Sequence, residues 1–206
     1  MSESILDRVP VIPVVVIDDV AHAVPLARAL VDGGLPVIEV TLRTPAALRA
    51  IHTIREQVPE VLVGAGTILS PANAIDAARE GAQFLVSPGS TPRLLDSMIA
   101  TGLPFLPGTS TVSEVLAVLE QGLTELKFFP AESSGGASYL QAISAVAPQA
   151  RFCPTGGITP ESAPSYLRLA NVPCVGGSWI APLKDLHARN WEHISKRAAD
   201  AARFAN

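Results

Sequence analysis

The sequence predicts an α/β protein, a compact (β/α)8 or TIM barrel, and two observations support this. Eight short apolar runs recur about 20 to 25 residues apart, and stretches with helical apolar spacing, such as 24–31 and 73–79, lie between them. Several runs are followed by a Thr-Pro or Ser-Pro pair that is typical of a helix start, namely at 44–45, 70–71, 91–92 and 159–160. Eight such βα units favour a barrel over an open doubly wound sheet.

The elements follow in order along one expected domain, residues 1–206. The predicted strands cover residues 11–17, 36–42, 61–67, 83–88, 104–109, 125–130, 150–157 and 172–177. Residues 2–8 are expected to form a short extra helix that covers the bottom of the barrel. No linker, low-complexity tract or shift in composition divides the chain. The alternative, a flavodoxin-like or Rossmann-like sheet, is disfavoured because no G-x-G-x-x-G motif follows the first strand.

Composition excludes several classes of protein. Hydrophobic residues make up 48% of the chain and charged residues 17%, so disorder is excluded. A net charge of −4 without a basic run gives no support for a nucleic-acid partner. No apolar stretch approaches the ~18 residues of a membrane span, and the first ten residues do not resemble a secretory signal. We therefore expect no membrane association and a cytoplasmic protein.

Neither cysteines nor histidines suggest a metal site. Cys153 and Cys174 are the only cysteines and lack metal-type spacing, so we interpret both as buried, small hydrophobic residues in a reducing compartment. The four histidines fall in helical stretches rather than at strand ends, and we interpret them as surface or packing residues.

One of the three lysines lies inside a predicted strand. Lys127 occurs in GluLeuLysPhePhePro at 125–130. Strand alternation places it on the face opposite to Leu126 and Phe128, so it points into the barrel if those two pack under the helices. Burial disfavours a charged ammonium group, and a neutral amine is the nucleophile that attacks a ketone. Lys127 is therefore either a Schiff-base nucleophile or half of a buried ion pair.

A carboxylate within strand 36–42 is expected to share the interior with Lys127. Alternation places Glu39 and Arg43 on one face of that strand. Glu39 is either a simple ion-pair partner or the group that moves protons during imine formation and carbon–carbon cleavage. The guanidinium of Arg43 suits the carboxylate of a keto acid, although a surface role is equally open. Thr67, at the end of its strand, is a candidate substrate contact or a simple turn residue.

Glycine pairs follow the last two predicted strands. The segments are Thr155-Gly156-Gly157 and Gly176-Gly177-Ser178. Glycine lets the backbone approach an anion closely, and a helix start nearby directs N–H groups toward it. Phosphate sites in this fold are frequently built from these two loops. Glycine also serves tight turns, but two pairs at the two expected positions favour a phosphate site, to which Ser178 adds a hydroxyl.

Motifs along nearly the whole chain carry a family resemblance. They are ValIleGluValThrLeuArgThr (37–44), GlyAlaGlyThr (64–67), SerProGly (87–89), LysPhePheProAlaGlu (127–132) and ThrGlyGlyIle (155–158). In combination, they resemble those of the bacterial 2-keto-3-deoxy-6-phosphogluconate (KDPG) aldolases, which also act as 4-hydroxy-2-oxoglutarate aldolases. GlyAlaGlyThr alone would not be specific, but the combination is.

The resemblance implies a role for each candidate residue. Lys127 would form the Schiff base and Glu39 would be the general acid/base. Arg43 and Thr67 would hold the pyruvyl carboxylate, while Pro88 and Phe129 would shape the pocket. The phosphate would lie against Gly156, Gly157, Gly176, Gly177 and Ser178. Thr155 matches the gluconate-type enzymes and favours that epimer.

The implied activity is that of a class I (Schiff-base) aldehyde-lyase. It would act on a small phosphorylated keto-deoxy sugar acid, would need no metal or organic cofactor, and would be a homotrimer like other family members. Three alternatives remain: a 2-keto-3-deoxy-6-phosphogalactonate aldolase, another phosphate-binding barrel such as an isomerase, and a non-catalytic binder of phosphorylated sugar acids. An isomerase would not need a lysine buried in a strand. Retention of both Lys127 and Glu39 argues against the non-catalytic binder.

Overall fold

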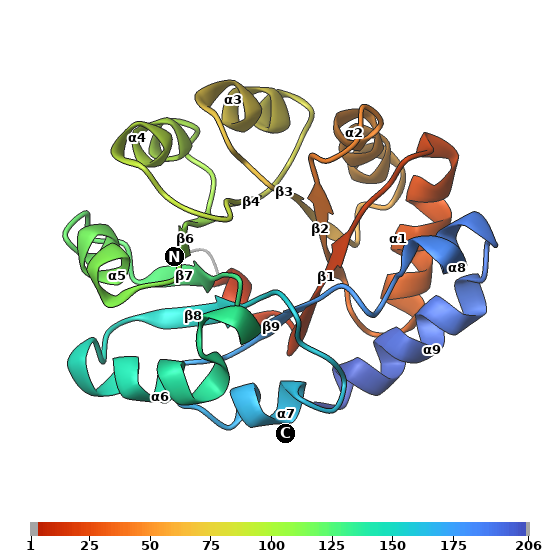
Figure 1. Ribbon diagram of the computed structural model, residues 1–206. Coiled ribbons are helices and arrows are strands. Elements are labelled where there is room, and N and C mark those ends of the chain that lie inside the picture. The colour runs from red at the N-terminus through yellow and green to blue at the C-terminus, as the bar shows by residue number, and fades with distance from the viewer. Residues whose placement is uncertain (1–3, 205–206) are drawn as a thin grey trace.

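The computed structural model describes residues 4–204, in which strands lie at the centre and helices around them (Figure 1). The strands are β1 (Val11–Val15), β2 (Val37–Thr41), β3 (Leu62–Gly66), β4 (Leu85–Val86), β5 (Phe105–Leu106), β6 (Gly108–Thr109), β7 (Glu125–Phe128), β8 (Arg151–Pro154) and β9 (Val175–Gly177). Every predicted apolar run thus contains a strand. The run at 104–109 contains two, because Pro107 lacks the N–H that would continue the ladder.

The strands form two sheets whose ladders are all parallel. The larger sheet has the order β5-β4-β3-β2-β1-β9, and the smaller has the order β6-β7-β8. β5 and β6 are consecutive in the chain, and an isolated parallel bridge joins Thr155 to Gly176 between β8 and β9. Parallel strands in sequential order with helical crossovers confirm the α/β class.

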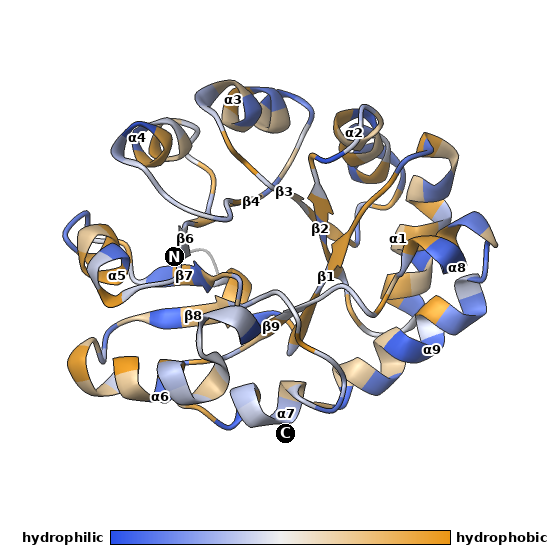
Figure 2. Cartoon of the chain, viewed as in Figure 1, coloured by the Kyte–Doolittle hydropathy of each residue, from blue (hydrophilic) through white to orange (hydrophobic). Residues whose placement is uncertain are grey.

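Helices follow nearly every strand and cover the outer faces of the sheets. They are α1 (Ala23–Asp32), α2 (Ala47–Gln57), α3 (Pro71–Arg79), α4 (Pro92–Ala100), α5 (Val112–Leu119), α6 (Gly136–Val146), α7 (Ala163–Leu167), α8 (Leu183–His187) and α9 (Trp191–Ala202). Figure 2 shows β1 and β2 as apolar strands and most helices with both apolar and polar residues, the pattern of a layered core. None of these helices, within the described part of the chain, is long and apolar enough to span a membrane.

Two of the four predicted helix starts are correct. Ser70 and Thr91 cap α3 and α4, each followed by proline in the first turn. At 44–45 the prediction was wrong: α2 begins at Ala47, and the hydroxyl of Thr44 donates instead to the carbonyl oxygen of Ile17. At 159–160 it was also wrong, because that turn only precedes α7, which begins at Ala163. A threonine or serine before a proline therefore does not by itself define the start of a helix.

The N-terminal segment forms a single 3-10 turn, Ile5–Asp7, capped by the hydroxyl of Ser4. This is shorter than the helix expected over 2–8, of which residues 2 and 3 lie outside the described residues. Ile5 and Leu6 are buried. Ser4 Oγ donates to Glu125 Oε1 at 2.6 Å, and Arg151 forms ion pairs with both Glu125 and Asp7. These contacts attach the turn to the first residues of β7 and β8.

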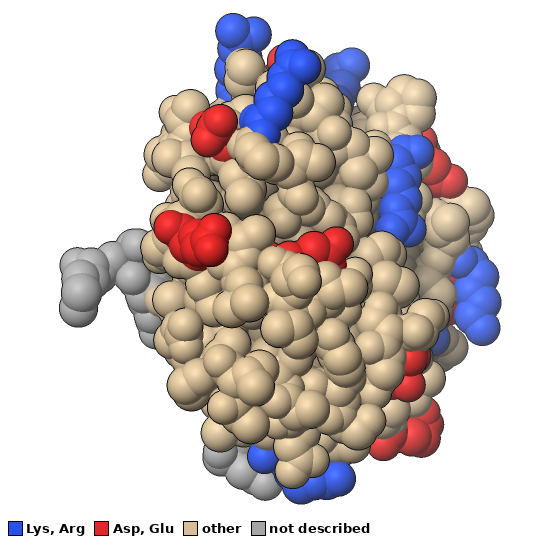
Figure 3. Space-filling model, turned by 60° about the vertical axis from the view of Figure 1, so that its left-hand side comes forward, with Lys and Arg blue, Asp and Glu red and all other residues tan. Residues whose placement is uncertain are grey.

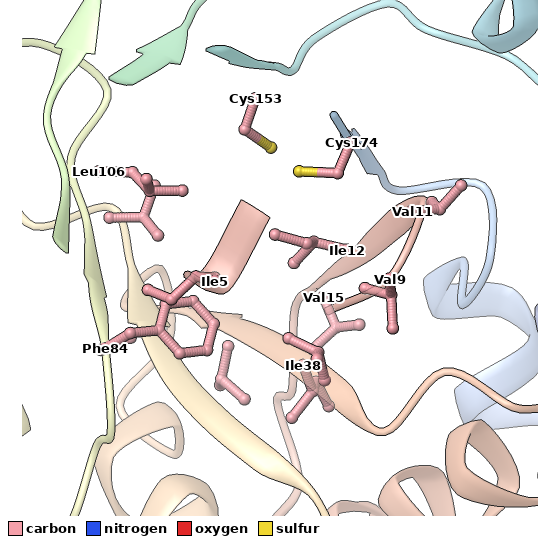
Figure 4. Close-up of a cluster of buried hydrophobic side chains, with 14 of the residues drawn as sticks. Ile5, Val9, Val11, Ile12, Val15, Ile38, Phe84, Leu106, Cys153 and Cys174 are labelled. Atoms are coloured by element: carbon pink, nitrogen blue, oxygen red, sulfur yellow. The ribbon is translucent and has the colours of Figure 1, made fainter. Parts of the chain in front are cut away.

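The lower part of the interior, toward the amino ends of the strands, is apolar. Figure 4 shows Ile5, Ile12, Phe84 and Leu106 together with the two cysteines. Cys153 and Cys174 are buried and unpaired, and their sulfur atoms face each other. A hydrogen bond with Cys153, together with burial, raises the pKa of Cys174. The prediction that both cysteines act as small buried residues is confirmed.

Candidate active site

Lys127 enters the interior because of the strand that carries it. On the other face of β7, Leu126 and Phe128 are completely buried, and Phe128 stacks on Tyr139 of α6 with ring centroids 5.8 Å apart. Alternation then directs Lys127 away from the helices. Its side chain is 6% exposed. The expectation that this lysine leaves the solvent is met by the packing of its two neighbours.

The amine meets one carboxylate in this interior. Lys127 Nζ donates to Glu39 Oε1 at 3.2 Å, and the Glu39 side chain is 3% exposed. Gly66 on the adjacent β3 makes room for the carboxylate, since a Cβ at that position would lie 2.1 Å from Glu39 Oε1. An ion pair this deeply buried is held in a medium where its attraction is strong and its desolvation expensive.

The Lys127–Glu39 contact is short enough to allow proton transfer. Within hydrogen-bond distance, a proton passed from Nζ to Oε1 leaves a neutral amine beside a neutral carboxyl group, so no net charge is created in the interior. Thr41, one step further along the same face of β2, instead donates to the carbonyl oxygen of Val15 at 2.9 Å. The carboxylate therefore faces the amine without competition from that hydroxyl.

A cavity of about 390 Å³ lies at the carboxyl ends of the strands, next to the pair. Its walls come from the ends of strands β1, β2, β7, β8 and β9 and from the loops after them: Val14, Val16, Thr41, Arg43, Phe129, Pro130, Ser133, Thr155, Gly156, Gly157, Ile158, Gly176 and Ser178. Phe129 links the cavity to the amine, because its ring centroid lies 5.5 Å from Lys127 Nζ. The amine therefore contacts a residue that lines the cavity.

Most of the predicted site residues gather here. Arg43, Phe129, Thr155, Gly156, Gly157, Gly176 and Ser178 line the cavity. Thr155 and Gly176 face each other across the β8–β9 bridge, and a Cβ on Gly176 would lie 2.2 Å from Thr155 Oγ1. Gly156 and Gly157 have φ values of 104° and 81°, a backbone conformation that favours glycine.

Five predicted residues lie outside the lining: Lys127 and Glu39, which are buried beside it, and Thr67, Pro88 and Gly177. Thr67 follows β3 in a left-handed conformation with φ 62°. Pro88 packs its backbone against Gly108, where a Cβ would lie 2.2 Å from the Pro88 carbonyl carbon. The space beside Gly177 is filled by Trp179 and Val11, each 2.8 Å from where a Cβ would lie, so a larger residue does not fit there.

The cavity also includes residues that sequence reasoning did not select. Val14 and Val16 of the first strand region, Pro130, Ser133 and Ile158 all line it. Ser133 could have been predicted from the sequence, because it carries a hydroxyl group and lies in the loop after the strand that contains Lys127. The two valines had none, since alternating apolar residues in a strand are equally typical of the core.

No group of three or more histidine, cysteine, aspartate or glutamate side chains in residues 4–204 is arranged to hold a metal ion. The described residues thus bring together an amine and a carboxylate, and these two reactive groups lie beside a pocket with a glycine-rich rim. This combination defines a class of protein, the lysine-dependent enzymes that act on carbonyl substrates.

Comparison with known proteins identifies the family. The family model for KDPG and KHG aldolase matches residues 2–197, and the chain belongs to this family. The KHG/KDPG aldolase of Escherichia coli K12 is 49% identical over 204 residues, covering 99% of this chain and 96% of the relative. The resemblance stated from the motifs is therefore confirmed.

Two solved structures extend the comparison. The KDPG aldolase of Legionella pneumophila, with pyruvate captured at low pH as a covalent carbinolamine intermediate, has a TM-score of 0.94 and 44% identity, covering 96% of both chains. The 2-keto-3-deoxy-6-phosphogluconate aldolase of Zymomonas mobilis ZM4 with 3-phosphoglycerate has a TM-score of 0.91 and 46% identity, covering 98% of this chain and 94% of that one.

Proposed function

We propose that this protein is a class I aldolase that cleaves 2-keto-3-deoxy-6-phosphogluconate to pyruvate and glyceraldehyde 3-phosphate. The observation that carries the proposal is the contact between a buried amine and a buried carboxylate, 3.2 Å apart, beside a pocket at the strand ends. The names of the relatives and the pyruvate carbinolamine of the Legionella enzyme support it. Cleavage of 4-hydroxy-2-oxoglutarate to pyruvate and glyoxylate uses the same pyruvyl half.

The reaction begins with the amine of Lys127. Glu39 accepts a proton from Nζ, and the neutral amine adds to the C2 carbonyl carbon of the keto acid to form a carbinolamine. Glu39 returns the proton to the carbinolamine hydroxyl, which leaves as water. The product is an iminium ion, whose positive nitrogen draws electrons from C3.

Cleavage follows from this electron sink. Glu39, directly or through a water molecule, removes the proton of the C4 hydroxyl, and the C3–C4 bond breaks. The C4 fragment leaves as glyceraldehyde 3-phosphate, and the bonding pair forms an enamine on the lysine. Protonation at C3 and hydrolysis release pyruvate and regenerate the amine. The iminium ion supplies the electron sink for cleavage of the C3–C4 bond.

The remaining predicted residues divide between the two ends of the substrate. Arg43 and Thr67 hold the pyruvyl carboxylate, with Pro88 and Phe129 against its carbon skeleton. The phosphate lies against Gly156, Gly157, Gly176, Gly177 and Ser178. The 3-phosphoglycerate in the Zymomonas structure supports an anion site in this family. We assign the gluconate epimer on the presence of Thr155, with the galactonate-type substrate as the alternative.

We further propose that residues 1–206 form one domain, a closed (β/α)8 barrel. Two features support closure. β5 and β6 act as halves of one strand, pairing with β4 and β7 respectively, and the Thr155–Gly176 bridge joins β8 to β9. All buried hydrophobic residues belong to a single cluster, which supports one domain. Two free, buried cysteines suit the cytoplasm.

A homotrimer is the assembly that we propose. The side of the molecule that carries α4, α5 and α6 has a broad area with few charged side chains (Figure 3). Helix α6 contains no charged residue, and Ile99, Leu116 and Val146 on this side are exposed, Val146 by 64%. Exposed apolar groups of this kind favour a subunit interface. Light scattering on the purified protein measures the assembly.

Borohydride trapping tests the proposed chemistry. Reduction in the presence of pyruvate is expected to add an irreversible pyruvyl mass to the peptide that contains Lys127. Lys184, an exposed lysine of α8, is the matched control: Lys184→Met should trap normally, and Lys127→Met should not trap. An adduct on another lysine, or none, contradicts the imine mechanism. Binding of the substrate without trapping or turnover would favour the non-catalytic binder.

A further inference from the structure

Glu132 lies directly behind the glycine loop and makes two kinds of contact with it. It follows β7 at the start of a 3-10 turn, Glu132–Ser134, next to the cavity-lining Ser133. Its backbone N–H donates to the carbonyl oxygen of Gly156 at 3.1 Å. A Cβ on Gly157 would lie 2.8 Å from Glu132 Cγ. The side-chain stem of Glu132 therefore supports the loop at van der Waals distance.

The carboxylate of Glu132 is hydrogen-bonded to a tyrosine. The hydroxyl of Tyr166, on α7, donates to Glu132 Oε1 at 2.8 Å. Tyr166 is 1% exposed, so its ring is fixed by the core. Burial, followed by this hydrogen bond and the nearby charge, raises the pKa of Tyr166. The hydroxyl thus stays a donor at neutral pH, and it holds a carboxylate that is otherwise exposed.

The direction of this carboxylate matters because of what the loop is proposed to bind. A carboxylate that moves freely beside Gly156 and Gly157 would repel an anion and compete for the backbone N–H groups that the anion needs. Fixed on Tyr166, it leaves those groups available, while its stem still supports Gly157.

We propose that Tyr166 and Glu132 form a positioning pair that keeps the glycine loop open to the phosphate of the substrate. The inference rests on the proposed phosphate end of the site. It concerns binding of the phosphorylated end and not the chemistry at Lys127. Loss of the pair should therefore weaken the binding of phosphorylated substrates and leave the binding of unphosphorylated substrates nearly unchanged.

Removal of one hydroxyl tests the pair. Tyr166→Phe keeps the buried ring and releases the carboxylate. We expect KM for 2-keto-3-deoxy-6-phosphogluconate to rise about tenfold with kcat little changed, because the released carboxylate repels the phosphate on the energy scale of one hydrogen bond to a charged group. KM for 4-hydroxy-2-oxoglutarate, which has no phosphate, should change less than about twofold. Tyr139→Phe on α6 is the matched control and should leave both constants unchanged.

A second substitution separates charge from shape. In the double variant Tyr166→Phe with Glu132→Gln, the unanchored side chain is neutral, so KM for the phosphorylated substrate should return to within about threefold of the parent value. Melting temperatures of all variants check that the fold is retained. A double variant no better than Tyr166→Phe would overturn the charge argument, and equal losses on both substrates would overturn the positioning role.

A titration with inorganic phosphate, followed by ³¹P NMR, makes the result independent of turnover. The parent protein should bind phosphate in competition with the phosphorylated substrate, and Tyr166→Phe should bind it more weakly. Equal binding by both proteins would overturn the inference while leaving the proposed function intact. Absence of binding by the parent protein would overturn the phosphate site itself, and with it this inference.

Discussion

Two ion pairs that involve residues of the same strand, β7, differ in how far they are exposed to solvent. Glu125 and Lys127 lie two residues apart on one face of β7. Near the amino end of β7, Glu125 pairs with Arg151 at 2.9 Å, and these side chains are 30% and 34% exposed. Together with Asp7, which also pairs with Arg151, they form the base network. In the interior, Lys127 pairs with Glu39, and these side chains are 6% and 3% exposed. We call Lys127 and Glu39 the upper pair, and the upper pair with the cavity beside it the upper region.

The difference teaches where a charged pair contributes to stability and where it serves chemistry. A partly exposed pair is screened by water and is worth about 0 to 1 kcal/mol. A buried pair is expensive to desolvate and often stabilises no better than apolar residues would. The base network attaches the N-terminal turn, whereas the Lys127–Glu39 pair holds an amine and its proton acceptor beside a pocket. Four measurements test this division.

The largest effect is expected at the carboxylate of the upper pair. Glu39→Gln keeps the shape of the side chain but can no longer accept the proton of the amine or of the substrate hydroxyl. We expect kcat for cleavage to fall by roughly 10²- to 10⁴-fold, the range for a lost acid/base group. Proton exchange into pyruvate should fall in parallel. Unchanged rates would remove Glu39 from the mechanism and make the pair purely structural.

The stability of the upper pair gives the next largest effect. Lys127→Met leaves Glu39 buried without its partner and should lower the free energy of unfolding by about 3 to 5 kcal/mol. Adding Glu39→Gln should recover most of that loss, because the uncompensated charge is gone. Urea unfolding measures both variants. A double variant as unstable as Lys127→Met would show that the pair, rather than its charge balance, supports the fold.

The hydroxyl of Ser178 tests the outer rim of the upper region. Ser178→Ala removes one donor to the substrate phosphate and should raise KM for phosphorylated substrate about tenfold, as expected for a hydrogen bond to a charged group. Unphosphorylated hydroxy-oxoglutarate and the melting temperature should be little affected, because Ser178 is exposed. Equal effects on both substrates would argue against a phosphate contact.

The smallest effect is expected at the base. Arg151→Met keeps the aliphatic stem while removing the ion pairs with Glu125 and Asp7. We expect the free energy of unfolding to fall by about 1 kcal/mol or less, and by still less in high salt, which screens exposed charges. The kinetic constants should not change. An altered kcat would mean that the base network reaches the active site and would end the division between the two regions.

Much of the architecture was predictable because it follows from local patterns. Each of the eight apolar runs contains a strand, and alternation correctly placed Lys127 on the face opposite to Leu126 and Phe128. Ser70 and Thr91 cap their helices as predicted. The failures at Thr44 and Thr159 have different causes. The hydroxyl of Thr44 donates to the carbonyl oxygen of Ile17, a partner that is known only after folding. The hydroxyl of Thr159 accepts from the backbone N–H of Ser162, but in a turn that ends before α7 begins.

The parts of the site that escaped prediction depend on contacts between distant segments. Tyr166 and Glu132 lie 34 residues apart, and nothing in the local pattern of α7 marks its tyrosine as a hydrogen-bond donor to the loop after β7. Pro107 divides one predicted strand into two, but only the pairing of each half with a different neighbour shows the consequence.

The sequence by itself determined the order of strands and helices, which residues of a strand share a face and, through its motifs, the family. It could do so because period-two alternation and family motifs are properties of short segments. Only the tertiary structure decided that Lys127 and Glu39, 88 residues apart, meet at 3.2 Å. That distance depends on the register of the parallel strands between them, which is set by packing over the whole core.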